Sequence, residues 1–245
     1  MSTTDTLCGW GEHDRVTYYL NNVNILVPKR QEQLAMLVDL LAGLPQGVRR
    51  VLDLGSGFGA ITQAILTRYP EASITCVDGS AEMLALAQER LQKEGARIEL
   101  LLGDLAFPAW REAVRGPFDA VVSGLAIHHL LDARKRQLYQ EVYTLLGNGG
   151  LFLNNDAVMS PPALQEWFTS LWYREMQAQE ERLRGVKRSI ESIRTELQEQ
   201  LRVGDHPSYM APLAVQLAWL GEAGFTSVDC YWKYLDFAIF GGVKV

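Results

Sequence analysis

The stretch "VLDLGSGFGA", residues 51–60, decides the expected fold. Its apolar start predicts a short buried strand, and a helix is expected over about residues 60–68. Gly55, Gly57 and Gly59 lie between the two elements. A sharp turn that lets a ligand approach the backbone favours glycine, which has no Cβ. The spacing fits two templates, G-x-G-x-x-(G/A) and D-x-G-x-G-x-G. The stretch therefore predicts either a ligand-binding loop, whose ligand the spacing does not identify, or a tight turn that binds no ligand.

Apolar strands and helices alternate on both sides of this stretch. Continuous apolar strands that alternate with helices predict a parallel sheet covered on both faces, a Rossmann-like α/β fold. Residues 161–201 break the alternation, because they predict two helices with no strand between them. The expected strands are "RVLDLG", "SITCVD", "IELLLGD", "FDAVVSGL", "LFLNND" and a closing hairpin of two strands, and the other expected helices start at Gln31, after the N-cap Ser80, at Asp132 and at Leu213.

We expect one domain over residues 1–245, in four parts. Residues 1–44 form an N-terminal arm, with one helical turn before residue 30 and then the first helix. Residues 45–157 form the core that carries the glycine loop. Residues 158–212 are a helical insertion or lid, and residues 213–245 are a closing helix and the last strands.

Composition and charge narrow the class of protein. The net charge is −6 with no basic tail, which weighs against a large nucleic-acid surface. Cys8, Cys76 and Cys230 form no C-x-x-C pair, so we expect reduced thiols in a cytoplasmic protein. No apolar run approaches the ~20 residues that a membrane span needs, and no signal peptide is recognised. Interleaved acids make "RLRGVKRSIESIR", residues 182–194, a predicted solvated helix face.

Three acids stand near the predicted ends of successive strands. Asp53 precedes Gly55 by two residues, Asp78 ends the second strand and Asp104 ends the third. A carboxylate at Asp78 can accept both hydroxyls of a ribose, and one at Asp104 can accept from an adenine amine. We expect all three acids to face the cleft. A cleft of this kind favours a positively charged nucleoside cofactor over a pyrophosphate.

Four motifs in this order resemble the class I S-adenosylmethionine-dependent methyltransferases: "VLDLGSGFG", "VDGSAEML", "GDL" and "FDAVVSGLAIHHL". The resemblance covers about residues 45–155 and is greatest to the small-molecule group of types 11, 12 and 25. The tail "LAWLGEAGFTSVDCYWKYLDFAIFGGVK" looks like that group's closing helix and antiparallel last strand. The resemblance implies a seven-stranded sheet and methyl transfer from S-adenosylmethionine to a small-molecule acceptor, which leaves S-adenosylhomocysteine.

The resemblance also implies cofactor contacts. The methionine moiety would contact Asp53 and the glycine loop, and the ribose would contact Asp78. Gly79 and Met83 would flank the adenine, Asp104 and Leu105 would read its edge, and Ser123 and Leu125 would lie below the methyl. The implied cofactor set is Asp53, Gly55, Ser56, Gly57, Gly59, Asp78, Gly79, Met83, Gly103, Asp104, Leu105, Ser123 and Leu125.

His128 and His129 follow the fourth strand and are the candidate catalytic residues. A neutral imidazole can accept a proton near neutral pH, which is needed only if the acceptor must lose one. Capping or packing of the next helix is the alternative role. Asp156 is a candidate to orient an amine or hydroxyl. No metal is expected, because Asn154, Asn155 and Asp156 alone do not form a metal cage.

Aromatic residues outside the core are candidates for the acceptor site. Tyr18, Tyr19 and Tyr209 have polar, loop-like surroundings and are expected to form a lid; with His128 and Asp156 they make up the predicted acceptor-binding set. We expect Trp167, Phe168 and Trp172 to bury the insertion against the sheet. Assembly is left open, with a homodimer among the alternatives.

Three other functions stay open. The layout also resembles carboxy-S-adenosylmethionine synthases of tRNA modification, in which an arginine is expected in the closing helix. Here "QLAWLGEAGF" offers Trp219 and no arginine, which favours methyl transfer. An NAD-dependent oxidoreductase would fit Gly55, Gly57 and Ala60, although the "GD" motif and the lack of a recognisable Tyr-x-x-x-Lys pair oppose it. The last alternative is a cofactor-binding subunit without activity.

Overall fold

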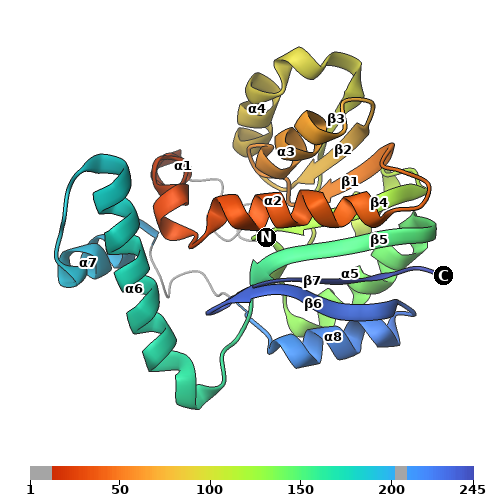
Figure 1. Ribbon diagram of the computed structural model, residues 1–245. Helices are drawn as coiled ribbons and strands as arrows, with labels where there is room; N and C mark the ends of the chain where they lie inside the picture. Colours follow the sequence, from red (N-terminus) through yellow and green to blue (C-terminus); the bar gives the residue numbers. More distant parts are fainter. Residues whose placement is uncertain (1–12, 202–208) are drawn as a thin grey trace, which may run out of the picture.

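A computed structural model describes residues 13–201 and 209–245 of the chain (Figure 1). A seven-stranded sheet has the order β3-β2-β1-β4-β5-β7-β6. Strands β1 to β5 are parallel, and β7 runs antiparallel to both β5 and β6. The predicted Rossmann-like sheet with an antiparallel last strand is therefore confirmed. The strands are β1 (Arg50–Leu54), β2 (Ser73–Asp78), β3 (Ile98–Leu102), β4 (Phe118–Gly124), β5 (Leu146–Ala157), β6 (Thr226–Tyr234) and β7 (Phe237–Val243).

Helices cover both faces of the sheet, because successive side chains of a strand point to opposite sides. In β1, Leu52 and Leu54 pack into the core beneath α5 and α8, whereas Val51 packs into the core beneath α2 and α3. These helices and their neighbours are α2 (Arg30–Leu40), α3 (Ala60–Arg68), α4 (Ala81–Arg90), α5 (Asp132–Leu145) and α8 (Leu213–Glu222). Ser80 caps α4 as predicted, since its Oγ accepts from the Met83 N–H at 3.2 Å.

One local prediction is wrong. In place of one helical turn, α1 (His13–Leu26) is a helix of 14 residues. Its Val16 and Val23 are buried, and packing against distant helices stabilises a segment that looks polar in sequence. Helix α5 ends at Leu145, directly before β5, and the "GNGG" segment lies within β5. There Gly149 takes a positive φ of 75° and its N–H donates to the Lys244 carbonyl at 2.7 Å.

The insertion forms two helices, as predicted: α6 (Pro162–Arg184) and α7 (Ile190–Leu201). Together with α1 they stand beside the carboxyl ends of the parallel strands (Figure 1); we call α1, α6 and α7 the cap. The expectation that Trp167, Phe168 and Trp172 bury the insertion against the sheet is wrong for Trp167 and Trp172. Trp167 is 59% exposed, and the Trp172 Nε1–H donates to the Leu26 carbonyl of the cap at 2.9 Å.

The cap has its own small apolar core, which includes Val23 of α1, Met176 of α6 and Ile193 of α7. Tyr19 of α1 packs against this core, and so do Phe58 and Leu125 from loops that follow strands of the sheet. The cap therefore forms one packed layer over the edge of the sheet at which β1, β2 and β4 end.

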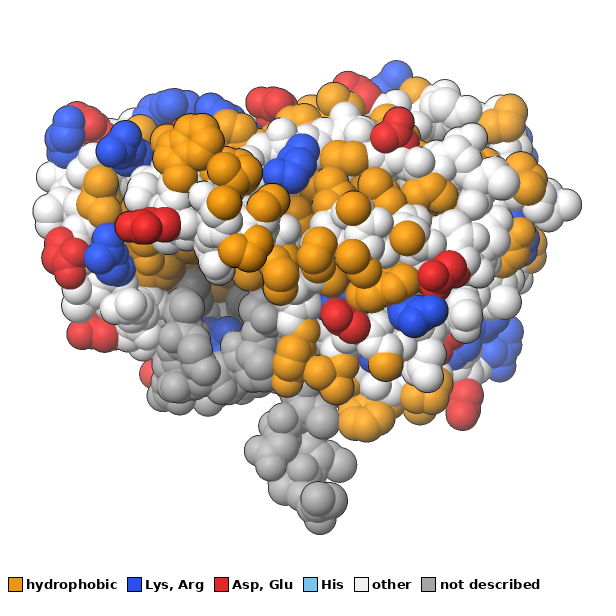
Figure 2. Space-filling view, turned by 90° about the horizontal axis from the view of Figure 1, so that it is seen from below, with side chains coloured by type: hydrophobic (Ala, Val, Ile, Leu, Met, Phe, Trp, Pro, Cys, Tyr) orange, Lys and Arg blue, Asp and Glu red, His pale blue; other side chains and the backbone are white. Residues whose placement is uncertain are grey.

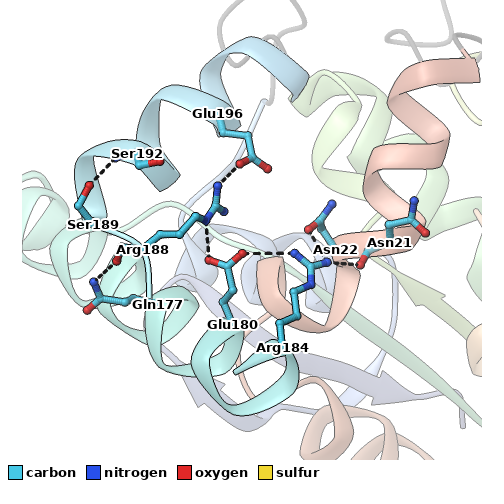
Figure 3. Close-up of polar contacts among 9 residues, drawn as sticks. All are labelled: Asn21, Asn22, Gln177, Glu180, Arg184, Arg188, Ser189, Ser192 and Glu196. Carbon is cyan, nitrogen blue, oxygen red and sulfur yellow. Dashed lines mark hydrogen bonds and ion pairs between the residues drawn. The ribbon is translucent and has the colours of Figure 1, made fainter. Parts of the chain in front are cut away.

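Charged residues also join the helices of the cap (Figure 3). The buried Glu180 carboxylate accepts from Arg184 Nη1 at 3.3 Å and from Arg188 Nε at 2.9 Å. Arg188 also pairs with Glu196 of α7, and Arg184 Nη2 donates to the Asn21 carbonyl of α1 at 2.8 Å. The prediction of a solvated face over residues 182–194 is wrong for Arg188, which is partly buried, whereas Arg184 is exposed.

The underside of the molecule is rich in apolar side chains (Figure 2). Helix α8 carries no charge before Glu222, and its Val215 is 38% exposed. A homodimer remains a prediction.

None of the helices in residues 13–201 and 209–245 is long and apolar enough to cross a membrane.

Candidate functional site

A cavity opens at the carboxyl ends of β1, β2 and β4, beneath the cap. The strand order reverses between β1 and β4, which is where open α/β sheets bind ligands. Many of the predicted site residues line this cavity: Tyr19, Gly55, Ser56, Gly57, Asp78, Gly79, Met83, Asp104, Leu105, Leu125 and His129. Others are not on its wall: Tyr18, Asp53, Gly59, Gly103, Ser123, His128, Asp156 and Tyr209.

The three glycines of the loop have different surroundings, although all three have a positive φ. At Gly55 a Cβ would lie 2.2 Å from the Ala126 Cβ, and at Gly59 it would lie 2.9 Å from Leu91 Cδ1. At Gly57 a Cβ would meet nothing within 4 Å. Gly55 is therefore required by close packing against Ala126, whereas the neighbour of Gly59 is the movable end of the Leu91 side chain. Gly57 leaves its side of the loop open to a ligand.

Asp78 connects the loop to the next strand. Its Oδ2 accepts from the Gly57 N–H at 2.7 Å and its Oδ1 from the Ser80 N–H at 2.8 Å. Burial raises the pKa of Asp78, and the charge of Asp104 adds to this effect. The Oδ1 of Asp104 accepts a hydrogen bond from the Ala106 N–H at 2.8 Å. Two carboxylates thus face one cavity from the ends of neighbouring strands.

Asp53 does not face the cavity, in contrast to the expected ring of three acids. It is 1% exposed and lies behind the loop, where its Oδ2 accepts from Thr62 Oγ1 at 2.7 Å. Burial raises the pKa of Asp53 to about 7, and the nearby Asp78 charge contributes to the rise. Asp53 therefore joins β1 to α3 and supports the loop from behind. Ser123 is similarly internal, with its Oγ donating to the Leu54 carbonyl at 2.8 Å.

The two histidines differ in their surroundings. His128 Nδ1 lies 2.6 Å from Asp156 Oδ1, and the His128 backbone N–H donates to Asp156 Oδ2 at 2.8 Å. Asp156 is 1% exposed, so its carboxylate orients His128 from beneath. The His129 ring lines the cavity and stacks on His128 with 3.9 Å between ring centroids. The structure thus brings the two imidazoles into contact, with His129 on the cavity wall and His128 behind it.

The three candidate lid tyrosines separate in the structure. Tyr19 lines the cavity, and its ring meets Phe58 edge to face at 6.4 Å. Burial raises the pKa of Tyr19 to about 12, so the phenol is neutral. Tyr18 lies within the cap, and Tyr209 N–H donates to the His128 carbonyl at 2.8 Å while its side chain stays 38% exposed.

Sequence reasoning missed several wall residues, among them the polar residues Arg30, Gln33 and Asn155. Gln33 is fully buried and its Nε2 donates to the Pro28 carbonyl at 2.6 Å, which leaves Oε1 without a partner among the described residues. A signal existed, because Gln33 lies on the apolar face of its helix, one turn before Leu37. A polar residue there predicts a buried hydrogen-bonding role.

The wall also offers unused buried acceptors for a polar ligand. In residues 13–201 and 209–245, Gln33 Oε1, Ser56 Oγ and Asn155 Oδ1 make no hydrogen bond. Buried polar atoms without partners are rare, and a ligand would satisfy them. No group of three His, Cys, Asp or Glu residues that could hold a metal exists in the same part of the chain.

The fold and the site define an α/β protein with a nucleoside-type cofactor cavity at the switch point of a doubly wound sheet. A family model described as a methyltransferase domain matches residues 51–150. Together with the relatives below, this shows that the chain belongs to the class I S-adenosylmethionine-dependent methyltransferases, so the predicted resemblance is confirmed. S-adenosylmethionine is the cofactor of this family, as predicted.

Relatives cover different shares of the chain. A carboxy-S-adenosyl-L-methionine synthase of Chromohalobacter salexigens is 30% identical over 193 residues, 77% of this chain and 66% of that protein. A release factor glutamine methyltransferase of Bordetella pertussis is 34% identical over 108 residues, 43% of this chain and 38% of that protein. The chain thus spans less than two thirds of the length of both relatives.

The fold is similar to that of a solved structure, Haemonchus contortus phosphoethanolamine N-methyltransferase 2 in complex with S-adenosyl-L-methionine. The TM-score is 0.64 at 17% identity, and the match covers 99% of this chain and 60% of that one. At this identity the likeness shows the fold alone.

Proposed function

We propose that this protein transfers the methyl group of S-adenosylmethionine to a small-molecule acceptor by in-line displacement. One observation carries the proposal: Gly57, Asp78 and Asp104 line the same cavity as His129. The first three offer a backbone surface and two carboxylates for a cationic nucleoside cofactor. The imidazole stands where an acceptor would lie, between the cofactor end of the cavity and the cap.

Each part of the cofactor has a matching group in the cavity. Asp78 is the acceptor for the ribose hydroxyls, and Asp104 is the acceptor for the adenine amine. The amino terminus of α3 favours the methionine carboxylate. The buried Gln33 Oε1 accepts from the methionine ammonium, which satisfies an atom that otherwise has no described partner. When bound, the cofactor supplies an electrophilic methyl group.

The protein contributes alignment, exclusion of water and, for an acceptor that carries a proton, a base. Alignment supplies much of the barrier reduction in such a displacement. We assign proton acceptance to His129, whose ring lines the cavity. His128 is a positioning residue, since Asp156 fixes its ring and it stacks on His129. Tyr19 closes the cavity from the cap and completes its aromatic wall.

A thermal shift measurement tests the cofactor. A ligand that binds only the native state at 100 times its Kd stabilises that state by about 2.7 kcal/mol. S-adenosylhomocysteine is expected to raise the Tm clearly, and NAD(H) is expected to leave it unchanged. The opposite pattern would favour an NAD-dependent oxidoreductase and overturn the proposal.

Turnover needs a separate experiment, because binding does not establish transfer. Panels of amines, phenols and carboxylates are incubated with methyl-labelled cofactor, and labelled products are separated. Once an acceptor is found, His129→Gln is expected to lower kcat with little change in the affinity for S-adenosylhomocysteine. Failure of all panels with intact cofactor binding would support a subunit without activity.

A carboxy-S-adenosyl-L-methionine synthase is the second candidate, because one relative of that name covers 77% of this chain. The closing helix α8 packs against α5, β6 and β7 and contributes no residue to the cavity wall. Its sequence carries no arginine for an added carboxylate. Mass spectrometry of the cofactor that copurifies with the protein distinguishes the two, and the carboxylated form would overturn methyl transfer.

A further inference from the structure

A second cavity adjoins the cofactor cavity, and α1, α2, α3 and α4 contribute its walls. Arg30, Leu34, Phe58 and Ala60 line both cavities. The Phe58 side chain therefore stands at the boundary. A molecule held in the second cavity can extend past Phe58 toward the cofactor.

Two guanidinium groups meet the same aromatic ring at this boundary. Arg30 Cζ lies 5.8 Å and Arg90 Cζ lies 4.7 Å from the centroid of Phe58. Both arginines line the second cavity. Stacking on an aromatic face holds a guanidinium in place without using its hydrogen-bond donors on a carboxylate.

Neither cation has an acidic partner in residues 13–201 and 209–245. The ion pairs among these residues, in which nitrogen and oxygen lie within 4.0 Å, all involve residues other than Arg30 and Arg90. Arg30 Nη1 donates to the neutral Asn24 Oδ1 at 3.0 Å. Glu89 also lines the second cavity but forms no ion pair with either arginine. The positive charge of the pair is thus not neutralised within the described chain.

The electrostatic consequence appears at Arg30. Burial lowers the pKa of Arg30, and the like charge of Arg90 lowers it further. Arg30 is partly buried and Arg90 is exposed. Like charges repel each other, and an anion bound beside both groups offsets that cost at Arg30. The side chains of Gln31 and Gln63 stand on the same walls and can donate further hydrogen bonds.

We propose that Arg30 and Arg90 bind an anionic group of the methyl acceptor, a carboxylate or a phosphate, in the second cavity. The acceptor then extends past Phe58, and its nucleophile reaches the cofactor cavity. Guanidinium groups suit both anions because their planar donors match pairs of oxygens. This inference rests on the proposed methyl transfer and adds to it the chemical class of the acceptor.

The test uses the full chain saturated with S-adenosylhomocysteine. Inorganic phosphate and succinate are titrated separately while NMR follows the arginine Nε–Hε resonances. We expect saturable shifts, and the probe that binds more tightly identifies the anionic group. Arg90→Gln should weaken probe binding by about tenfold or more. It should leave the affinity for S-adenosylhomocysteine unchanged, because Arg90 does not line the cofactor cavity.

Arg68→Gln is the matched control, since Arg68 is an exposed arginine of α3 that stacks on Tyr69. Three results would overturn the acceptor site: no saturable shift, equal effects of the two substitutions, or competition between phosphate and S-adenosylhomocysteine. Competition would assign the arginines to the cofactor's own carboxylate. If the probes bind but S-adenosylhomocysteine does not, the anion site stands and the proposed methyl transfer fails.

Discussion

The glycine loop and Tyr19 of the cap line one cavity, but the loop and the cap are held together in different ways. Asp78 holds the loop through the backbone N–H groups of Gly57 and Ser80, which are 21 and 2 residues away. In the cap, Arg184 donates a hydrogen bond to the carbonyl of Asn21, which is 163 residues away in the sequence. Contacts between residues that are near in sequence produce a recognisable motif, whereas contacts between residues that are distant in sequence do not. Three predictions below test this difference, from the largest expected effect to the smallest, and a fourth concerns the dependence of stability on pH.

Gly55→Ala should cause the largest loss, about 3–4 kcal/mol of unfolding free energy. The new Cβ meets Ala126 at 2.2 Å and must also adopt a positive φ. Gly57→Ala has the positive φ without the clash and should lose only about 1–2 kcal/mol. Urea denaturation of both variants measures the difference. Equal losses would show that close packing does not distinguish the two glycines.

Asp78→Ala should weaken the binding of S-adenosylhomocysteine by about 100-fold, since a charged acceptor of hydrogen bonds is removed. Isothermal titration measures the affinity, and far-UV circular dichroism checks that the fold is retained. Asp39→Ala, an exposed change on α2, is the control. An unchanged affinity in the Asp78 variant would contradict the assignment of the ribose to this carboxylate.

Glu180→Gln should loosen the cap by about 2 kcal/mol, because it removes the carboxylate shared by Arg184 and Arg188. Hydrogen exchange should then be faster in α1 and α7 and unchanged in β1. Glu181→Gln is the control, because its pair with Lys187 is exposed on both sides. Uniform loss of protection across the whole chain would show that the cap does not open by itself.

The last prediction concerns Asp53 and is a dependence of stability on pH. Its pKa rises from 3.8 to about 7 on folding, so the native state holds more protons than the unfolded state between these values. The stability of the protein relative to Asp53→Asn should therefore fall as the pH rises from about 4 to about 7. Urea denaturation across this range measures the trend, and a constant difference would place Asp53 in a solvated setting.

The candidate site, like the fold, has parts that the sequence predicts and parts that depend on long-range contacts. Asp78, Asp104 and the glycine loop were predictable, because parallel strands deliver their carboxyl ends to one edge of the sheet. Asp53 shows the limit of that argument, since position beside the loop does not say which way a side chain points. Gln33 left a signal as a polar residue on an apolar helix face, whereas Arg30 gave none.

The sequence by itself determined the sheet, the position of the glycine loop and the family, because alternating strands, helices and turns are encoded within a few residues of each other. The tertiary structure alone decided that α1 is a long helix, that Glu180 is a buried partner of two arginines and that Arg30 and Arg90 meet at Phe58. These features depend on which distant helices pack together. Their energy comes from burial and charge pairing across the chain, which local pattern does not record.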